Sequence, residues 1–394
     1  MKYYFFCFAL IGMMALGVTT GCNKRGAKFI ANSGEIDTLS IRQMPAKLYK
    51  AHMYAYGPYN KVGDSIFGTI VCNFGKDFPG RNSHGGPVAL QYPNGDLVAF
   101  HSNCSEHNID GWSEYSVSKD GGRTWNMYNK FAYSYNAHQA DNDSPAWVEQ
   151  GLVTSTGSAV ILFITHLKHY THDDRRVGSG FVRSLDNGQT WSEYQPLDGD
   201  FAGYPVTAFS VGSTNYVLYD DSKGPHVLFV STDDGVNWSR RSTLPLQNEI
   251  WYGTMCFMKD GRLIAGGYLN DEYGQFFYYC ISNDDGVTWG PQKKTYLDKR
   301  IRNAKISCIG GKYYLCGRAG HGKAYGNQFV IFQSNDGENW GPGVIVNSDP
   351  QGPDGYSNVC VIDKGDGPEV MVVYSICYAH RITNSYVFFI KPLE

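Results

Sequence analysis

Two histidines, His84 and His101, stand at the two ends of a segment that reads as a pair of short strands joined by the turn P93-N-G-D96. Imidazole titrates near neutral pH, so two such side chains on neighbouring strands can serve as a general base and a general acid. The same two residues could instead bind sugar hydroxyls or make structural hydrogen bonds. The pair is therefore a candidate catalytic centre, with binding or a structural function as the alternative.

Other polar and aromatic side chains occur at corresponding places, before or after short apolar runs. Together with the two histidines, we predict three further catalytic residues, Asp110, Tyr204 and Tyr356. The candidates for substrate binding are Asp143, His166, Asp220, Trp251, Tyr252, Arg302 and Arg318. A polar recess lined by aromatic rings suits sugars, because their hydroxyls need many hydrogen-bond partners and their C–H faces stack on rings.

The histidine-rich run H166-L-K-H-Y-T-H172 raises the question of a metal site. Side chains at i and i+3 of an extended strand point to different faces, and the chain has no ordered Cys/His spacing of the kind that binds zinc. We therefore predict no required cofactor. A structural metal ion is the alternative, because the carboxylates Asp173 and Asp174 follow directly.

An octapeptide that recurs along the chain indicates which scaffold positions these side chains. S118-K-D-G-G-R-T-W125 returns as S184-L-D-N-G-Q-T-W191, S231-T-D-D-G-V-N-W238 and S282-N-D-D-G-V-T-W289. Q333-S-N-D-G-E-N-W340 reads as a degraded copy, with Gln333 and Asn335 where the others have Ser and Asp. In such a turn Asp accepts hydrogen bonds from the loop backbone, Gly takes a positive φ and Trp packs beneath the neighbouring hairpin.

The octapeptide resembles the Asp-box, or BNR repeat, of the sialidase-like β-propellers. The closing tryptophans lie roughly 50 to 65 residues apart, close to the length of one four-stranded blade. We predict an all-β, six-bladed β-propeller, or seven blades if residues 28–80 contain another partial one. The last unit, Tyr356 to Pro392, has no box, and the run S65-I-F-G-T-I-V-C-N-F74 is expected to supply its fourth strand.

Propeller geometry then sorts the residues by face. The repeated octapeptides connect the third and fourth strands of their blades, so they all lie on one face and are expected to be scaffold. The starts of the first strands and the ends of the second strands lie on the opposite face, around a central funnel. The candidate residues belong to that second face.

The first residues read as an export signal. Lys2 precedes an apolar run from Tyr3 to Val18, which T19-T-G-C22 follows. This order resembles a bacterial lipoprotein signal, which implies acylation of Cys22; ordinary signal cleavage beside an incidental cysteine is the alternative. We predict a signal peptide at residues 1–22, a tether at 23–40 and the propeller at 41–394, in a protein held at the outer membrane or cell surface.

The net charge indicates which partners the protein can bind, and the positions of the cysteines indicate the state of its thiols. The formal net charge is −3, which leaves no basic footprint for nucleic acid. We expect a monomer that binds oligo- or polysaccharide and meets the membrane through its lipid anchor only. The cysteines beyond Cys22 lie singly in apolar runs and read as buried free thiols, and a bridge between Cys308 and Cys316 cannot be derived from sequence.

The resemblance to sialidases can be tested on single residues. That chemistry uses three arginines around a carboxylate, an Asp acid/base and a Tyr nucleophile supported by a Glu. Tyr356 and Asp110 match the Tyr and the Asp. The arginines do not match, because S83-H-G-G-P87 and Tyr268 stand at two of their places, and Phe257 stands where the Glu is expected. We therefore do not expect true sialidase activity.

A second resemblance is to propeller polysaccharide lyases such as the ulvan lyases. H84-G-G-P, followed by N94-G-D-L-V-A-F-H101, is similar to their first blade, and Tyr204-Pro205 is similar to their third. It implies β-elimination beside a uronate, in which Arg neutralises the carboxylate and His or Tyr moves protons. Asp220 stands where the lyases have an arginine, so Arg302 or Arg318 would replace it, or the substrate is not acidic there.

Three functions remain open at this point. The favoured one is an exported carbohydrate-active enzyme, a glycoside hydrolase that acts on complex glycans or polysaccharides. The alternatives are a lyase or propeller glycosidase on uronate-containing glycans that uses the paired histidines, and a glycan-binding propeller without catalysis. The sugar and the linkage do not follow from the sequence.

Overall fold

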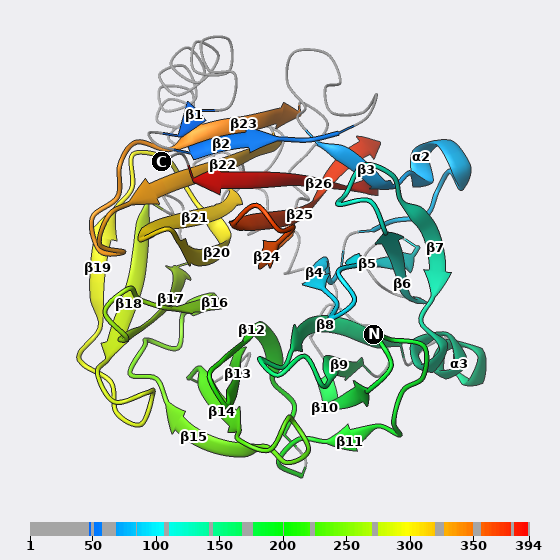
Figure 1. Ribbon diagram of the computed structural model, residues 1–394, viewed down its shortest axis with the longest axis horizontal. Helices are drawn as coiled ribbons and strands as arrows, with labels where there is room; N and C mark the ends of the chain where they lie inside the picture. Colours follow the sequence, from blue (N-terminus) through cyan, green and yellow to red (C-terminus); the bar gives the residue numbers. More distant parts are fainter. Residues whose placement is uncertain are drawn as a thin grey trace, which may run out of the picture.

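The computed structural model describes residues 47–48, 51–56, 68–83, 85–105, 110–141, 145–167, 176–199, 201–220, 225–269, 275–319, 327–349, 356–379 and 382–392. These residues form six antiparallel sheets that stand around a common axis like the blades of a propeller (Figure 1). The predicted all-β, six-bladed fold is confirmed, and no seventh sheet occurs in these ranges.

Each of the first five blades is a four-stranded meander that is continuous in sequence, and its first strand lies nearest the axis. The strands, from the inside outward, are β4 (Val88–Gln91), β5 (Leu97–Cys104), β6 (Gly111–Ser118) and β7 (Asn126–Lys130) in blade 1; β8 (Ala146–Val153), β9 (Val160–Leu167), β10 (Arg176–Ser184) and β11 (Gln195–Pro196) in blade 2; β12 (Tyr204–Val211), β13 (Thr214–Asp220), β14 (Val227–Ser231) and β15 (Ser239–Thr243) in blade 3; β16 (Ile250–Phe257), β17 (Leu263–Leu269), β18 (Phe276–Ser282) and β19 (Lys293–Tyr296) in blade 4; and β20 (Arg302–Ile309), β21 (Lys312–Arg318), β22 (Asn327–Ser334) and β23 (Val344–Asp349) in blade 5.

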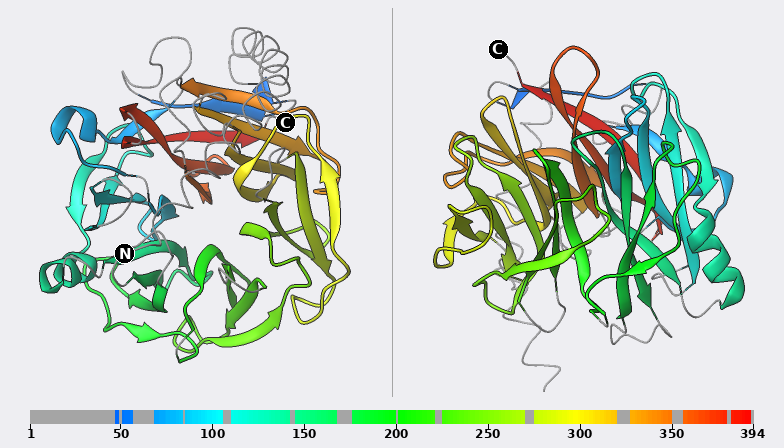
Figure 2. Two further views of the ribbon diagram at one scale, coloured as in Figure 1. Left: turned by 180° about the vertical axis from the view of Figure 1, so that it is seen from behind. Right: turned by 60° about the horizontal axis from the view of Figure 1, so that its bottom comes forward.

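Blade 6 joins the two ends of the chain and closes the ring. Its inner strands are β24 (Ser357–Asp363), β25 (Pro368–Ala379) and β26 (Ile382–Pro392). The outer edge of β26 pairs with two early strands, β3 (Thr69–Cys72) at its beginning and β2 (Ala51–Tyr54) at its end (Figure 2). The predicted contribution of the run around β3 is confirmed, and the sequence analysis missed β2, which a short β1 (Lys47–Leu48) extends.

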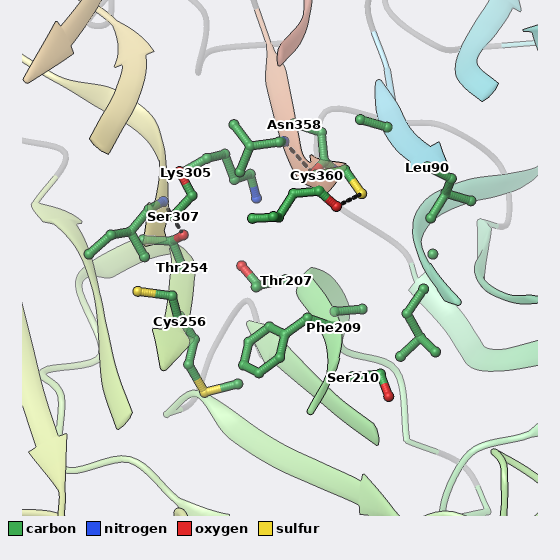
Figure 3. Close-up of a pocket in the computed structure, with 18 of the residues that line it drawn as sticks. Leu90, Thr207, Phe209, Ser210, Thr254, Cys256, Lys305, Ser307, Asn358 and Cys360 are labelled. Atoms are coloured by element: carbon green, nitrogen blue, oxygen red, sulfur yellow. Dashed lines mark hydrogen bonds between the residues drawn. The ribbon is translucent and has the colours of Figure 1, made fainter. Parts of the chain in front are cut away.

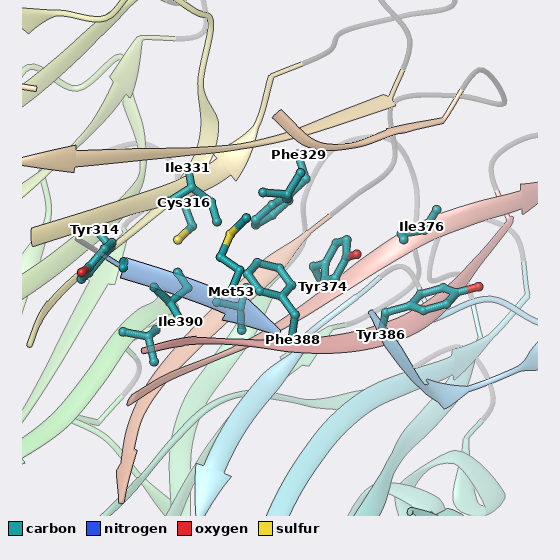
Figure 4. Packing of buried hydrophobic residues seen from close by; sticks show 14 of the residues in the cluster. Met53, Tyr314, Cys316, Phe329, Ile331, Tyr374, Ile376, Tyr386, Phe388 and Ile390 are labelled. Atoms are coloured by element: carbon teal, nitrogen blue, oxygen red, sulfur yellow. The ribbon is translucent and has the colours of Figure 1, made fainter. Parts of the chain in front are cut away.

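Apolar side chains between neighbouring sheets hold the ring together. Where blades 5 and 6 meet, Phe329 and Tyr374 lie with ring centroids 4.9 Å apart, and Phe388 packs against both (Figure 4). Met53 of β2 belongs to the same buried cluster. Closure of the ring therefore rests on core packing as well as on strand pairing.

In the described ranges, two short helices lie outside the blades. Helix α2 (Phe74–Asp77) follows β3, and α3 (Ala132–Ala140) connects blade 1 to blade 2. In the part of the chain described here, no helix is long and apolar enough to span a membrane.

The repeated octapeptides form turns of one kind between the third and fourth strands, as the first of them shows. The Ser118 hydroxyl donates to Asp120 (2.8 Å), and the Gly122 N–H donates to Ser118 Oγ (2.8 Å). Asp120 accepts hydrogen bonds from the Thr124 hydroxyl and backbone, which lower the pKa of its carboxyl to about 2. Trp125 Nε1 donates to the Gly122 carbonyl (3.2 Å). Each turn is thus stabilised by contacts within eight residues.

The fifth turn corrects the alignment made from sequence. Ser334 and Asp336, rather than Gln333 and Asn335, make the Ser and Asp contacts: Ser334 Oγ donates to Asp336 (3.0 Å) and accepts from the Gly337 N–H (2.9 Å). This turn is one residue shorter between its Asp and its Gly than the other four. A deletion, rather than a loss of the two polar residues, explains why it looked degraded.

The cysteines in the described residues are free thiols, as predicted. In the β20–β21 hairpin, Cys308 lies opposite Tyr313, whereas Cys316 lies opposite Lys305. The two sulfurs are therefore not cross-strand neighbours, and the register does not favour a bridge between them.

Candidate functional site

The inner strands of all six blades begin at the face opposite the repeated turns, and there they enclose a small recess of about 30 Å³. We call this the funnel pocket; it is lined by Gly86, Pro87, Glu149, Gln150, Tyr204, Pro205, Val206, Tyr252, Asn303, Lys305, Tyr356, Ser357 and Asn358. Every blade contributes to it. The pocket therefore exists only because the ring is closed.

Three tyrosines from different blades meet at the funnel pocket. The hydroxyls of Tyr252 and Tyr356 are 3.4 Å apart, and their ring centroids are 5.9 Å apart. Tyr204 stands edge-on to Tyr252 at 6.3 Å. All three rings are partly exposed. The structure thus brings together two predicted catalytic residues and one predicted substrate-binding residue.

Backbone bulges occur at the starts of two inner strands that reach the funnel pocket, β16 and β20. Tyr252 has a φ of 48° and Asn303 a φ of 53°, a region that side-chain-bearing residues rarely adopt. Both occur where the pairing with the next strand shifts register. The N–H of Tyr252 donates to Asp220 Oδ2 (2.9 Å), so Asp220 holds the bulge of the next blade. Trp251, beside it, is 42% exposed at the rim.

Arg302 and Arg318 lie opposite each other on β20 and β21, and both are buried. The Arg318 guanidinium lies 5.3 Å from the ring centre of Tyr356. Arg302 is 5.7 Å from the ring centre of Tyr268, and its Nε is 3.4 Å from the Tyr268 hydroxyl. Two positive charges from blade 5 therefore stand next to the tyrosines, each against an aromatic face.

A buried acid and a buried base lie at the floor of the funnel pocket, and neither is among the site residues predicted from the sequence. Glu149 is 6% exposed and Lys305 is 7% exposed. Burial first, and then the charge of Glu149 and its hydrogen bond, raise the pKa of Tyr204. Lys305 donates to the carbonyl of Val206, and burial lowers its pKa to about 8 despite the nearby carboxylates of Glu149 and Asp220.

A signal for these two residues was present in the sequence. Each is a charged residue inside the apolar run of an inner strand, W147-V-E-Q-G for Glu149 and A304-K-I-S for Lys305. Burial of a charge is costly unless it is paired, so a charged residue at such a position is unusual for a purely structural strand.

The remaining described candidates lie elsewhere. His101 sits in the middle of β5 rather than at its end, opposite Glu114, and its buried ring packs edge-on against Phe74 at 5.8 Å. Burial lowers the pKa of His101. His166 Nε2 lies 3.0 Å from the Tyr133 hydroxyl, where β9 packs near α3. Neither histidine lines the funnel pocket.

Asp110 also stands apart from the funnel pocket. Its carboxylate accepts a hydrogen bond from the Ser105 N–H (2.9 Å) and lies 3.9 Å from Arg81. Partial burial opposes ionisation, but the contacts with Ser105 and the charge of Arg81 hold the pKa of Asp110 below its ordinary value.

Several predictions fall outside the described residues: His84, Asp143, Cys22 and the run 169–174. Among the residues that the structure does describe, no three His, Cys, Asp or Glu side chains are placed to hold a metal ion.

The fold is that of the sialidase-like propellers. A protein of unknown function from Dyadobacter fermentans matches with a TM-score of 0.64 and 14% identity, over 79% of this chain and 95% of that one. The Hadza microbial sialidase Hz136 matches with a TM-score of 0.61 and 16% identity, over 83% and 69%. The NanB sialidase of Streptococcus pneumoniae matches with a TM-score of 0.55 and 11% identity, over 85% and 71%. No family model matches the sequence, and no curated protein does.

Proposed function

We propose that the protein is an exported glycoside hydrolase, anchored to the bacterial envelope by a lipid on Cys22, that acts on complex glycans or polysaccharides. One observation carries the proposal: at the funnel pocket the phenol of Tyr204 is hydrogen-bonded to the buried carboxylate of Glu149. A nucleophile in contact with its base is what covalent catalysis requires. The similarity to sialidases supports carbohydrate chemistry in general, because a fold by itself does not specify a reaction.

In this proposal Tyr204 is the nucleophile. Its raised pKa keeps the phenol protonated until attack, when Glu149 accepts the proton as Tyr204 Oη bonds to the anomeric carbon. The bond from that carbon to the leaving oxygen breaks, and Tyr356 protonates the leaving oxygen. Water then attacks the same carbon and gives a proton to Tyr356, while Tyr204 leaves and regains its proton from Glu149.

The surroundings of the tyrosines suit a sugar. Trp251 is a large exposed ring at the rim on which a sugar C–H face can stack. Arg318 and Arg302 add positive charge beside Tyr356 and Tyr268, which favours a sugar that carries an anionic group. A phenol nucleophile suits such a substrate, since a carboxylate nucleophile would repel it.

The test is digestion of complex plant, algal and host glycans by the wild-type protein and the variants Tyr204→Phe, Glu149→Gln and Tyr356→Phe. Tyr296→Phe is the matched control, because Tyr296 is an exposed tyrosine on the outer strand of blade 4. We expect saturated sugars from the wild-type protein, a loss of roughly 10²–10⁴-fold in kcat for each of the three funnel variants, and no loss for Tyr296→Phe.

The other outcomes would replace this function with an alternative. Unsaturated uronates among the products would indicate a lyase, with the Tyr204–Glu149 pair as the base that removes the C5 proton. Glycan binding without any product, unchanged in all three variants, would indicate a recognition protein.

A further inference from the structure

Besides the funnel pocket, the inner strands enclose a second, larger cavity of about 410 Å³, which we call the channel cavity (Figure 3). The later parts of all six inner strands line it, so it lies toward the face of the repeated turns. Its volume is within the range of small-molecule sites. The repeated turns are stabilised by their own hydrogen bonds and do not depend on this cavity.

The walls of the channel cavity are mostly apolar. Phe209, Met255 and Phe257 line it, together with the thiols of Cys256, Cys308 and Cys360 from β16, β20 and β24. At its mouth Val211 is 45% exposed and Val361 is 49% exposed. The cavity therefore opens to solvent through an apolar rim, which favours entry of an apolar body.

The inner end of the channel cavity is polar. Of the described residues that line it, only Lys305 carries a formal charge, and Figure 3 shows its side chain extending into the space near Thr207 and Thr254. Lys305 also lines the funnel pocket, so it marks the wall between the two. Its carboxylate neighbour Glu149 lines the funnel pocket and not the channel cavity.

We propose that the channel cavity is a second ligand site, which binds a small amphiphile with its apolar chain along the touching rings of Phe209 and Phe257 and its carboxylate head against Lys305. A carboxylate there gains a charge-assisted hydrogen bond in a place of low dielectric, while the chain leaves water. The site is separate from the proposed hydrolase centre, and binding to it is measured without any glycan.

The test is calorimetric titration of the intact protein with octanoate, octan-1-ol and octylamine, which share a chain and differ in their head groups. We expect octanoate to bind with one site per chain, octan-1-ol at least about tenfold more weakly and octylamine not at all. Lys305→Met should reduce octanoate affinity to that of octan-1-ol. Lys294→Met, a change of an exposed lysine on β19, should leave both affinities unchanged.

A second variant keeps the test informative if Lys305→Met fails to fold. Val361→Trp places a large ring at the half-exposed rim and should weaken octanoate and octan-1-ol alike. The proposal is overturned if octanoate does not bind, if it binds no better than octan-1-ol, or if Val361→Trp leaves its affinity unchanged.

Discussion

The two ends of the propeller axis differ in how they use the same blades. At the turn face, Ser118, Ser184, Ser231 and Ser282 each accept the N–H of a glycine four residues on and donate to an aspartate two residues on. At the funnel face, corresponding strand starts carry different residues, such as Gly86, Tyr204, Tyr252 and Asn303. The repeated residues stabilise the turns of the first five blades, whereas the strand starts at the funnel face differ from blade to blade and can differ in function.

The ionisable groups of the two faces are shifted in opposite ways. On the turn face, Asp120 is exposed and Asp186 is partly exposed, and hydrogen bonds from the threonine at the end of each turn lower their pKa values to about 2. In the funnel, burial raises the pKa of Tyr204 and lowers the pKa of Lys305 to about 8, so the charged form of each group is less favoured than in water. Exposed charges stabilise the local turn, whereas the buried groups are poised to exchange protons.

The largest expected effect separates activity from stability. Glu149→Gln keeps the size of the side chain but removes the base beside Tyr204, so we expect kcat to fall roughly 10²–10⁴-fold on any glycan that the wild-type protein cleaves. Ser118→Ala, on the turn face, should leave kcat unchanged. Steady-state rates of both variants decide this, and equal losses would mean that the two faces are not functionally distinct.

The next effect concerns stability alone. Ser118 is buried, and its removal leaves the Gly122 N–H without its acceptor, so Ser118→Ala should lower the free energy of unfolding by about 1–3 kcal/mol. Ser239→Ala, which changes an exposed serine on β15, is the control and should be close to neutral. Urea unfolding measures both. A neutral Ser118→Ala would remove the turns from the stabilising scaffold.

Acid should weaken the turn face selectively. Asp120, Asp186 and Asp336 of the turns have pKa values of about 2 when folded, below the ordinary 3.8, so their stabilisation is complete above about pH 4 and is lost as the pH falls toward 2. Asp120→Asn should therefore make the unfolding midpoint less dependent on pH in this window. An identical pH dependence in the variant and the wild-type protein would contradict this linkage.

The smallest effect distinguishes one turn from another. Trp125 Nε1 donates to the Gly122 carbonyl, whereas Trp340 Nε1, in the shortened turn, is buried with no partner among the described residues. Trp125→Phe should therefore cost about 1 kcal/mol more than Trp340→Phe. Thermal unfolding of the two variants, compared with the wild-type protein, measures the difference.

Sequence reasoning predicted the architecture better than the placement of single side chains. Tyr204, Tyr252 and Tyr356 were chosen because they stand at strand starts, and the strand starts do meet. The sequence predicts that the strand ends at His101, after the run L97-V-A-F. In the structure β5 continues to Cys104, so His101 lies in mid-strand. The end of a strand depends on pairing with its neighbours, which a single strand's residues do not specify.

The number of blades could be read from the chain because each repeated turn is stabilised by residues within eight positions of one another. The meeting of Glu149, Tyr204 and Lys305 could not be read from the chain in this way, because these residues come from β8, β12 and β20 and come together only when the ring closes. Local hydrogen bonds leave a repeating pattern in a sequence. Contacts across the axis leave none, because the curvature of the whole ring decides which strand starts face each other.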